Sequence, residues 1–274
     1  MRTGYCVITS FDAPKWGPGT RIQGKWQGKV YVIEQLLGEG ANGRVYLVRN
    51  NQQKYALKMG FHLIDHQLEV NALAAQDKAR WKRKPFLKES DDYVWQGKKY
   101  PFYVMRYIDG IYPELFLEKY GQDCFGILGY QLLRKLQHFH DNGYVFGDLK
   151  PENVLVTKFG EVQLIDYGGV TEIGKSIRQY TQRYDRGYWG GGGRRADAAY
   201  DLFSFCVLSI HLVRADTLSG MIQMGVERLP DQLLQIVRDT PMLQSRFSFY
   251  KLALTGKFAS AGEAASYWKQ WMYS

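Results

Sequence analysis

The chain has 274 residues, of which 45% are hydrophobic and 23% are charged. These proportions exclude a disordered polypeptide and are typical of a globular protein with a buried core. No run reaches the roughly 18 consecutive apolar residues that a membrane-spanning helix needs. The longest apolar-rich stretch, residues 202–213, is interrupted by serines and a histidine, so we predict a buried helix there and no membrane segment within the chain.

The net charge of +9 favours anionic partners such as nucleic acid, lipid headgroups or phosphate-bearing ligands, although an ordinary basic enzyme explains it equally well. The N-terminus lacks the continuous apolar stretch of a secretory signal. Cys6, Cys124 and Cys206 are scattered and odd in number, which argues against a disulfide framework or a thiolate metal site. We therefore expect a reducing, cytoplasmic location. The sequence leaves open a membrane anchor beyond residue 274.

The first third of the chain has the pattern of strands. Residues 1–29 are rich in Gly, Pro and Trp without periodicity, so we predict a loosely structured N-terminal arm. Three short apolar segments between residues 30 and 60 predict an antiparallel meander. Residues 65–80 have apolar side chains at helical spacing and predict a helix, and residues 91–108 predict two strands joined by a turn at Gly97.

From about residue 112 the pattern becomes helical, and one predicted helix ends at the C-cap signal Gly143. A strand-rich part with one helix, followed by a helix-rich part, predicts an α+β fold of two lobes. Ligands commonly bind in the cleft between such lobes. We place the N-lobe at residues 30–108 and the C-lobe at residues 109–274.

Gly38, Gly40 and Gly43 form a GxGxxG pattern, with Val45 two residues further on. The pattern alone is weak evidence, because it also occurs where a strand leads into a helix in dinucleotide-binding folds. Here another β segment follows, and a glycine-rich hairpin can place bare main-chain N–H groups over phosphates. A plain hairpin turn is the competing interpretation.

Lys58 lies between apolar residues of a predicted strand, where a lysine needs a partner unless its ammonium group reaches solvent. Glu69, in the predicted helix that follows, is the natural partner. Such a pair can hold the α and β phosphates of a nucleotide, whereas an isolated surface pair would contribute little.

The stretch YVFGDLKPENVLV (144–156) contains Asp148, Lys150 and Asn153, and Asp166 follows at the end of a predicted strand. Asn153 and Asp166 offer oxygen ligands of the kind that Mg²⁺ binds. Asp148 can then accept a hydroxyl proton or orient the hydroxyl group. Lys150 can neutralise charge on a transferring phosphoryl group.

In this order and spacing, the motifs resemble the Hanks-type (eukaryotic-like) serine/threonine protein kinases, especially their small bacterial members, over roughly residues 30–274. The resemblance implies a bilobal protein-kinase-like fold, with an antiparallel sheet and one helix in the N-lobe and a mostly helical C-lobe. It implies ATP as the phosphoryl donor, Mg²⁺ or Mn²⁺ as the metal, and serine or threonine in protein substrates as acceptor. We also expect autophosphorylation, and the sequence leaves a homodimer open.

The resemblance also implies the roles of individual residues. The catalytic set is Asp148, Lys150, Lys58 and Glu69, and the metal ligands are Asn153 and Asp166. The nucleotide-binding set is Gly38, Gly40, Gly43, Val45, Ala56, Lys58, Met105, Arg106, Tyr107, Ile108 and Leu155.

Two further residues match family positions that support the catalytic loop. Thr181 stands where a threonine commonly bridges Asp148 and Lys150. Asp201 stands where an aspartate braces this loop, although a helix N-cap is an alternative role for it.

The chain departs from the family where Phe146 and Gly147 replace a His-Arg pair. Phe146 can pack against Tyr167 in place of the histidine. Gly147 cannot pair with a phosphate on the activation segment, residues 168–181. We therefore expect activity without such phosphorylation, or control by another ligand. The family's Ala-Pro-Glu is also missing, and Lys257 rather than an arginine lies near the usual partner position.

Because every phosphate, metal and hydroxyl contact of the family is present, we predict an active enzyme. An inactive pseudokinase that acts as a nucleic-acid-binding or partner-binding scaffold is the alternative. An aminoglycoside-type small-molecule kinase is a weaker interpretation, since DLKPEN is typical of kinases with protein substrates.

Two groups of basic residues stand apart from these motifs. Residues 78–88 contain no acidic residue and include Trp81 and Phe86, so they could neutralise phosphates of DNA while the rings stack on exposed bases. A solvated loop is the competing interpretation. The basic residues of this stripe are Lys78, Arg80, Lys82, Arg83, Lys84 and Lys88. The second group, in which Arg183 and Arg186 could select acidic residues or phosphates of a substrate, is Arg178, Arg183, Arg186, Arg194 and Arg195.

Overall fold

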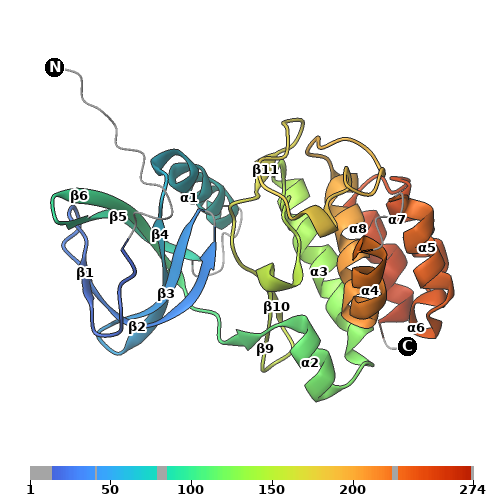
Figure 1. The fold of residues 1–274 in the computed structure, drawn as a ribbon, viewed down its shortest axis with the longest axis horizontal. Coiled ribbons are helices and arrows are strands. Elements are labelled where there is room, and N and C mark those ends of the chain that lie inside the picture. Colours follow the sequence, from blue (N-terminus) through green and yellow to red (C-terminus); the bar gives the residue numbers. More distant parts are fainter. Residues whose placement is uncertain (1–13, 41, 79–84, 224–227, 273–274) are drawn as a thin grey trace. The chain divides into compact units, whose positions relative to one another are not determined.

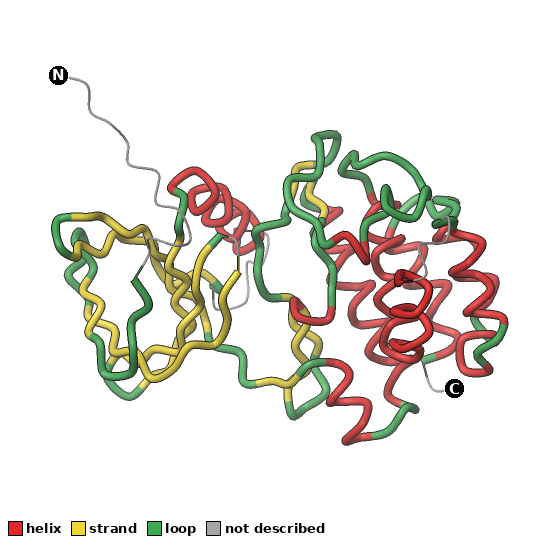
Figure 2. The backbone as a smooth tube through the Cα atoms, in the orientation of Figure 1, coloured by secondary structure: helices red, strands yellow, loops and turns green. Residues whose placement is uncertain are grey.

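The computed structural model describes residues 14–40, 42–78, 85–223 and 228–272. The chain forms two compact units, Met1–Ile108 and Asp109–Ser274. The first unit holds a sheet and one helix, and the second consists mainly of helices (Figures 1 and 2). The predicted α+β class is confirmed by this distribution.

The first unit is built on one antiparallel sheet with the strand order β1-β2-β3-β4-β6-β5. Its strands are β1 (Arg21–Gln23), β2 (Val30–Gly40), β3 (Gly43–Asn50), β4 (Gln53–Gly60), β5 (Leu87–Trp95) and β6 (Lys98–Arg106). The predicted meander is therefore confirmed as β2, β3 and β4, and the two predicted later strands are β5 and β6.

Helix α1 (Leu63–Lys78) connects β4 to β5 and begins two residues before the predicted start. Its last turn is tied to the sheet by Asp77, whose carboxylate accepts the main-chain N–H groups of Phe86 and Leu87, both at 2.8 Å. Residues 79 and 80, the end of the predicted helix, lie outside the described residues.

One face of the sheet is covered by an aromatic and aliphatic core. Because successive side chains of a strand point to opposite faces, Tyr46 and Val48 of β3 share this face with Leu57 and Met59 of β4. The buried members of the core are Trp16, Ile22, Tyr31, Ile33, Tyr46, Val48, Tyr55, Leu57, Met59, Phe61, Tyr100, Phe102 and Val104.

The prediction of a loosely structured arm over residues 1–29 is wrong for residues 14–29, while residues 1–13 lie outside the described part of the chain. β1 pairs with β2, and Ile22 is completely buried. Trp16 is buried with its ring edge-on to those of Tyr93 and Tyr100, at centroid distances of 5.6 and 5.2 Å. Single large side chains therefore hold this segment, and they leave no periodic pattern in the sequence.

A carboxylate fixes the turn that follows β1. Asp91 of β5 accepts the main-chain N–H groups of Trp26 and Gln27 at 2.9 and 2.8 Å. The donors and the acceptor are more than 60 residues apart in the chain, so this contact also gives no local sequence signal.

The second unit contains seven α-helices and several short strands among its described residues. The helices are α2 (Pro113–Tyr120), α3 (Cys124–Asp141), α4 (Ala198–Gln223), α5 (Pro230–Arg238), α6 (Pro241–Gln244), α7 (Phe247–Leu254) and α8 (Ala261–Trp268). The strands are β7 (Gly110–Ile111), β8 (Tyr144–Val145), β9 (Val154–Thr157), β10 (Val162–Leu164) and β11 (Thr171–Glu172). Gly143, the predicted C-cap signal, follows the end of α3 with a φ of 82°.

Helix α4 contains the predicted buried helix. Every residue from Tyr200 to Ile210 is buried, and the helix is kinked at Arg214, where φ is −137° and ψ is 49°. By length and composition α4 is the one helix of the described chain that could cross a membrane, but the core helix of a folded domain meets the same criteria. The burial of its first half, Tyr200–Ile210, favours the core interpretation.

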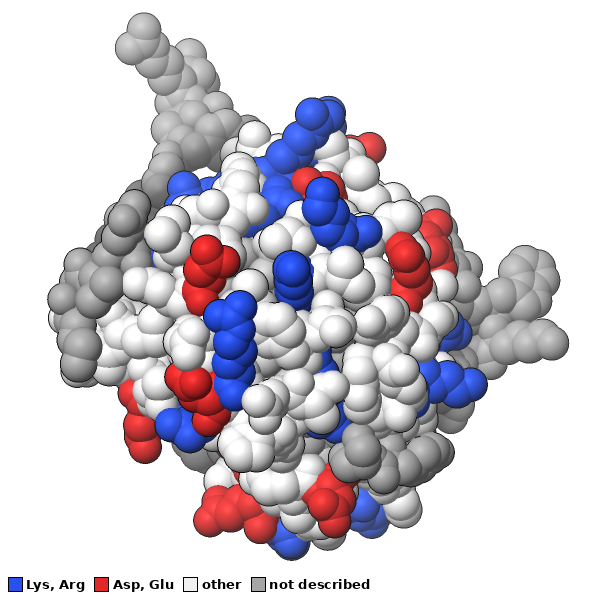
Figure 3. All heavy atoms as spheres, turned by 90° about the vertical axis from the view of Figure 1, so that its right-hand side faces the viewer, with Lys and Arg blue, Asp and Glu red and all other residues white. Residues whose placement is uncertain are grey.

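The surface of the second unit is mixed in charge around α5 and α7. Figure 3 shows Lys and Arg side chains on this face interspersed with Asp and Glu and separated by uncharged residues. This face therefore presents no continuous basic surface.

We predict that Trp16→Ala lowers the free energy of unfolding by about 3–5 kcal/mol, because it leaves a cavity in the aromatic core. Urea unfolding followed by circular dichroism measures the change. Trp26→Ala is the matched control, since Trp26 is 68% exposed, and it should cost about 0.5 kcal/mol or less. Equal effects of the two substitutions would contradict the assignment of residues 14–29 to the folded first unit.

Candidate active-site residues

The residues of the first unit that the sequence assigned to nucleotide binding share one face of the sheet. Directly paired residues of antiparallel strands lie on the same face. Val45 pairs with Lys58, Lys58 pairs with Tyr103, and Ala56 pairs with Met105. Since Ala56 and Lys58 are two residues apart, both pairs are on the same side, opposite the aromatic core.

Lys58 and Glu69 form the predicted ion pair. The Lys58 ammonium lies 2.9 Å from Oε1 and 2.8 Å from Oε2 of Glu69, and both side chains are almost completely buried. Tyr103 donates its hydroxyl hydrogen to Oε2 at 2.8 Å. A buried pair of this kind stabilises the fold only weakly, but it fixes the position of each charge, and removing one partner leaves the other uncompensated.

His66 packs one turn before Glu69 on α1, with its ring 5.4 Å from that of Tyr103. Burial lowers the pKa of His66 to about 4. The imidazole is therefore neutral near pH 7, and it adds no second positive charge beside Lys58.

The three glycines of the GxGxxG pattern differ in how closely other atoms pack against them. A Cβ atom on Gly43 would lie 2.3 Å from the main-chain oxygen of Met59, so the close packing of β3 against β4 requires a glycine there. A Cβ atom on Gly38 or Gly40 would meet nothing within 4 Å among the described residues, and both positions are exposed. Packing of the first unit explains Gly43 alone, which leaves the other two glycines available to a ligand.

The predicted adenine-binding residues are only partly open to a ligand. The main-chain N–H of Arg106 donates to the oxygen of Phe86 at 2.9 Å, so Arg106 can offer only its carbonyl. Tyr107 and Ile108 follow it and are half-buried. Leu155 lies on β9 of the second unit and is also half-buried.

Asp148, in the loop between β8 and β9, is held by side chains from two parts of the second unit. Its Oδ1 accepts the hydroxyl hydrogen of Thr181 at 2.8 Å, and its Oδ2 lies 3.0 Å from the ammonium of Lys150. Lys150 also donates to the Thr181 hydroxyl oxygen at 3.0 Å. The expected bridge from Thr181 to Asp148 and Lys150 is thus present, and it fixes the orientation of the carboxylate. Asp148 is 3% exposed.

Asn153 and Asp166 supply oxygen atoms suited to a cation. The Asn153 amide nitrogen donates to the main-chain oxygen of Asp148 at 2.8 Å, so its amide oxygen is the atom that remains to bind a metal. Asp166 follows β10 with a φ of 58°, and its Oδ1 accepts the N–H of Gly168 at 3.2 Å. Within the described ranges no three His, Cys, Asp or Glu residues form a metal site.

Asp201 of α4 holds the start of the catalytic loop. Its carboxylate is completely buried and accepts the main-chain N–H groups of Phe146 at 2.7 Å and Gly147 at 2.9 Å. Nε2 of His140 lies 2.9 Å from the same carboxylate. Three donors therefore compensate the buried charge.

The alternative role of Asp201 as a helix N-cap is wrong. Helix α4 begins at Ala198, and the residue before it is Asp197. Oδ1 of Asp197 accepts the main-chain N–H of Tyr200 at 2.8 Å, which is the hydrogen bond of an N-cap.

Gly147 is fixed by backbone geometry as well as by its lack of charge. Its φ is 80°, and a Cβ atom there would lie 2.3 Å from the main-chain oxygen of Gly169. A Cβ atom on Gly169 would in turn lie 2.7 Å from Cβ of Asp148. The catalytic loop and the start of the activation segment are thus in direct backbone contact, and an arginine at position 147 would not fit. The sequence analysis missed Gly169, although the double glycine in Asp166-Tyr167-Gly168-Gly169 was a visible signal.

The predicted contact of Phe146 with Tyr167 is present, with ring centroids 6.2 Å apart and planes at 78°. Phe139 of α3 contacts both rings, at 5.5 and 5.8 Å. An aromatic cluster therefore occupies the place where the family uses a histidine.

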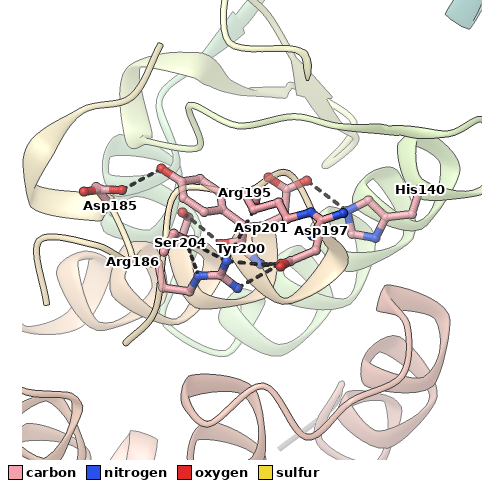
Figure 4. A network of polar contacts seen from close by, with 9 residues as sticks. His140, Asp185, Arg186, Arg195, Asp197, Tyr200, Asp201 and Ser204 are labelled. Carbon is pink, nitrogen blue, oxygen red and sulfur yellow. Dashed lines mark hydrogen bonds and ion pairs between the residues drawn. The ribbon is translucent and has the colours of Figure 1, made fainter. Parts of the chain in front are cut away.

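A polar network, formed by Asp185, Arg186, Arg194, Asp197 and Tyr200, follows the activation segment. Figure 4 shows its members Asp185, Arg186, Asp197 and Tyr200. Arg186 donates through both Nη atoms to Asp197, at 2.8 and 3.1 Å, and is 8% exposed. Asp185 accepts the Tyr200 hydroxyl hydrogen at 2.8 Å and lies 2.7 Å from Arg194. The sequence analysis did not predict this network, which supplies ion pairs where the family's Ala-Pro-Glu is missing.

The network corrects one prediction for the second basic group. Arg186 cannot select acidic substrate residues, because it is buried and its guanidinium is used by Asp197 and by the main-chain oxygen of Gly193. Arg178 and Arg195 are exposed, Arg183 is half-exposed, and Arg194 is exposed but paired with Asp185.

Most of the basic stripe over residues 78–88 lies outside the described residues. This holds for Arg80, Lys82, Arg83, Lys84 and Trp81, and for the side chain of Lys78. Lys88 is exposed. Phe86 is 4% exposed, so the prediction that its ring stacks on bases is wrong.

Comparison with known proteins assigns the chain to a family. The pattern of the family described as "Protein kinase domain" matches residues 31–248, so the chain belongs to the protein kinases. It is 36% identical over 250 residues to serine/threonine-protein kinase YabT of Bacillus subtilis (strain 168). The alignment covers 90% of this chain and 72% of YabT.

More distant relatives agree. The chain is 29% identical over 147 residues to a RAC family serine/threonine-protein kinase homolog of Dictyostelium discoideum, which covers 50% of this chain and 32% of that protein. A structure of vaccinia related kinase 3 has a TM-score of 0.65 at 16% identity, over 96% of this chain and 92% of that one, and confirms the bilobal kinase fold. The chain is accordingly a serine/threonine protein kinase, an ATP-dependent transferase that uses a divalent metal and acts on proteins.

We predict that Gly169→Ala lowers kcat on the order of 100-fold, because the new methyl group displaces Asp148 and small displacements of a catalytic group are costly. Phosphoryl transfer to a serine peptide measures the effect. Gly193→Ala is the matched control, since a Cβ atom there meets no described residue within 4 Å, and its rate should stay near that of the unsubstituted protein. An unchanged rate for Gly169→Ala would show that the backbone contact does not position the carboxylate.

Proposed function

We propose that the chain transfers the γ-phosphoryl group of Mg-ATP to a serine or threonine hydroxyl, with the residues predicted from the sequence in the roles given there. Main-chain N–H groups around Gly38 and Gly40 bind phosphate oxygens. Lys58, oriented by Glu69, holds the α and β phosphates. Asn153 and Asp166 would hold the metal, which when bound neutralises charge on the phosphates. Mn²⁺ is an alternative to Mg²⁺.

The arrangement around Asp148 is the observation that supports this proposal best. With Thr181 on Oδ1 and Lys150 on Oδ2, the carboxylate has a fixed orientation next to a cation. The substrate hydroxyl oxygen attacks the γ-phosphorus, the bond to the β–γ bridging oxygen breaks, and the hydroxyl proton passes to Asp148. Lys150 offsets the negative charge on the group in transfer.

An active enzyme is favoured over a pseudokinase scaffold because the polar contacts of the catalytic residues are complete in each unit. Lys58 is paired with Glu69 at 2.8 Å, and Asp148 is paired with Lys150 at 3.0 Å. A scaffold would need neither pair, and each keeps a charge out of water at some cost in stability.

We propose that activity does not require phosphorylation of the activation segment. Position 147 has no arginine to bind a phosphate, and the contact of Gly147 with Gly169 holds the start of the segment instead. Thr171 is buried and donates to the oxygen of Gly169 at 2.9 Å, so its hydroxyl is not accessible to a kinase. Ser176 is exposed and is our candidate for autophosphorylation.

DNA binding through the stripe over residues 78–88 stays a second proposal, supported by its six basic residues without an acid. A homodimer is left open by the sequence. We also propose a cytoplasmic location, because Cys124 and Cys206 are free thiols, as expected in a reducing compartment.

One experiment tests the proposed function. The unsubstituted protein and Asp148→Asn are incubated with labelled ATP and either Mg²⁺ or Mn²⁺, with and without duplex DNA, and the modified residues are mapped. Asp148→Asn keeps the shape of the side chain but loses the proton acceptor, so we expect transfer to fall by a factor of about 100 or more while nucleotide binding persists.

Transfer at equal rates by both proteins would assign the activity to a contaminant and favour the scaffold alternative. Transfer that depends on phosphorylated Ser176, tested with Ser176→Ala, would overturn the proposal of phosphorylation-independent activity. Rates that do not change with DNA at any salt concentration would remove DNA as a regulator.

A further inference from the structure

Three exposed basic side chains of the second unit lie on the activation segment and on residues 194–196, which run beside it. They are Lys175, Arg178 and Arg195, and we call them the basic cluster. In the part of the chain that the structure describes, no carboxylate forms an ion pair with any of them. Neighbouring arginines behave differently, since Arg186 and Arg194 are both used by the polar network.

Hydrogen bonds hold two members of the cluster together. Residues 174–177 and 194–196 run antiparallel, with the N–H of Ala196 donating to Lys175 at 2.8 Å and that of Ile177 to Arg194 at 2.9 Å. Ser176 forms an antiparallel bridge with Arg195. A Cβ atom on Gly174 would lie 3.8 Å from Nη2 of Arg195, so this guanidinium lies beside residue 174.

The two paired stretches, residues 174–177 and 194–196, form a ribbon that is anchored by buried side chains. Ile177 and Ala196 pack with Val145 and Tyr200 in a small hydrophobic cluster. Lys175 and Arg195 are therefore presented from a fixed backbone, although their side chains are in solvent.

The third member, Arg178, directly precedes a residue that contacts the catalytic carboxylate. Gln179 and Thr181 both donate hydrogen bonds to Asp148, at 3.4 and 2.8 Å. Arg178 directly precedes Gln179, so its main chain lies one residue from a group in contact with the catalytic oxygen atoms. Arg178 therefore belongs to the segment that contacts the catalytic carboxylate, one residue from Gln179 and three from Thr181.

The acidic groups around the cluster are few. Asp185 and Asp197 are taken by Arg194 and Arg186, and Glu172 of β11 is an exposed carboxylate two residues before Gly174. Glu152, in the loop of Asp148, is a second exposed carboxylate and acts on Tyr184, three residues after Thr181. The three cations of the cluster outnumber these two carboxylates, in contrast to the mixed charge around α5 and α7 (Figure 3). Charge of one sign beside an active site attracts substrates of the other sign and disfavours like-charged ones.

We propose that the basic cluster selects protein substrates whose phosphorylated serine or threonine is flanked by acidic groups. The recognised chemistry is an anion on the peptide, either a carboxylate or a phosphate already present on a neighbouring residue. Arg178 and Arg195 form charge-assisted hydrogen bonds to these anions, and Lys175 adds a point charge. The inference rests on the protein kinase activity and adds the class of substrate.

The test compares serine peptides of one length whose flanking residues are aspartate, phosphoserine, alanine or lysine. We expect kcat/KM to be about tenfold higher for the aspartate and phosphoserine peptides than for the alanine peptide, and lowest for the lysine peptide. The preference should shrink as salt rises, because exposed charges are screened. The ratio of phosphoserine to aspartate peptide separates the two sources of negative charge.

The variant Arg178→Glu/Arg195→Glu should reverse the order of the lysine and aspartate peptides and leave the alanine peptide within about twofold. The control Lys251→Glu/Lys269→Glu makes the same change of charge at two exposed residues of α7 and of the turn after α8, and it should keep the original order. Circular dichroism and nucleotide binding check that both proteins fold.

Each result decides the inference. Equal kcat/KM for acidic and basic peptides, with transfer intact, overturns the inference and leaves the proposed function standing. No transfer to any peptide contradicts the proposed function together with the inference. Loss of DNA binding in Arg178→Glu/Arg195→Glu without a change in peptide preference assigns the cluster to nucleic acid and overturns the inference. If this variant does not fold, the salt dependence of the unsubstituted protein's preference still decides.

Discussion

The catalytic loop depends on one buried carboxylate. Asp201 lies on the core helix α4 and is completely buried, so its charge is tolerable only because it is fully hydrogen-bonded. Two of its three donors are the main-chain N–H groups of Phe146 and Gly147, the residues that directly precede Asp148. The buried part of the core helix α4 therefore fixes the backbone from which the catalytic side chain extends. Thr181 and Lys150 then orient that side chain.

The same constraint explains how the chain can lack a phosphate-binding arginine. With Gly147 fixed at a φ of 80°, the main chain of the loop approaches Gly169 too closely for any side chain. β11 also pairs with β8, which joins Thr171 and Glu172 to the strand before the loop. Backbone contacts thus position the start of the activation segment, whereas an arginine would do so only after a phosphate is added. Beyond the activation segment, the polar network around Asp185 and Arg186 fixes the chain by side-chain contacts.

Local patterns in the sequence predicted strands β2 to β6 of the first unit, helix α1 and the long helices of the second unit. Residue type and order predicted the pair of Lys58 with Glu69, and the family resemblance implied the contact of Thr181 with Asp148. Contacts between distant residues were missed. Trp16, Gly169 and the pair of Arg186 with Asp197 depend on which segments meet in space, and no periodicity or motif records that. The error over residues 14–29 has this cause, since one tryptophan and one aspartate order a segment that reads as irregular.

Replacing Asp201 with asparagine tests the account most directly. An amide has one oxygen and places an NH₂ group against a main-chain N–H, so at least one of the two loop donors loses its acceptor. Amide hydrogen exchange should then accelerate at Phe146 and Gly147, and kcat should fall on the order of 100-fold with little change in the KM for ATP. The exposed Asp231→Asn on α5 serves as the control and should change neither quantity. A folded Asp201→Asn protein with protected amides and an unchanged kcat would contradict the claim that this carboxylate positions the catalytic loop.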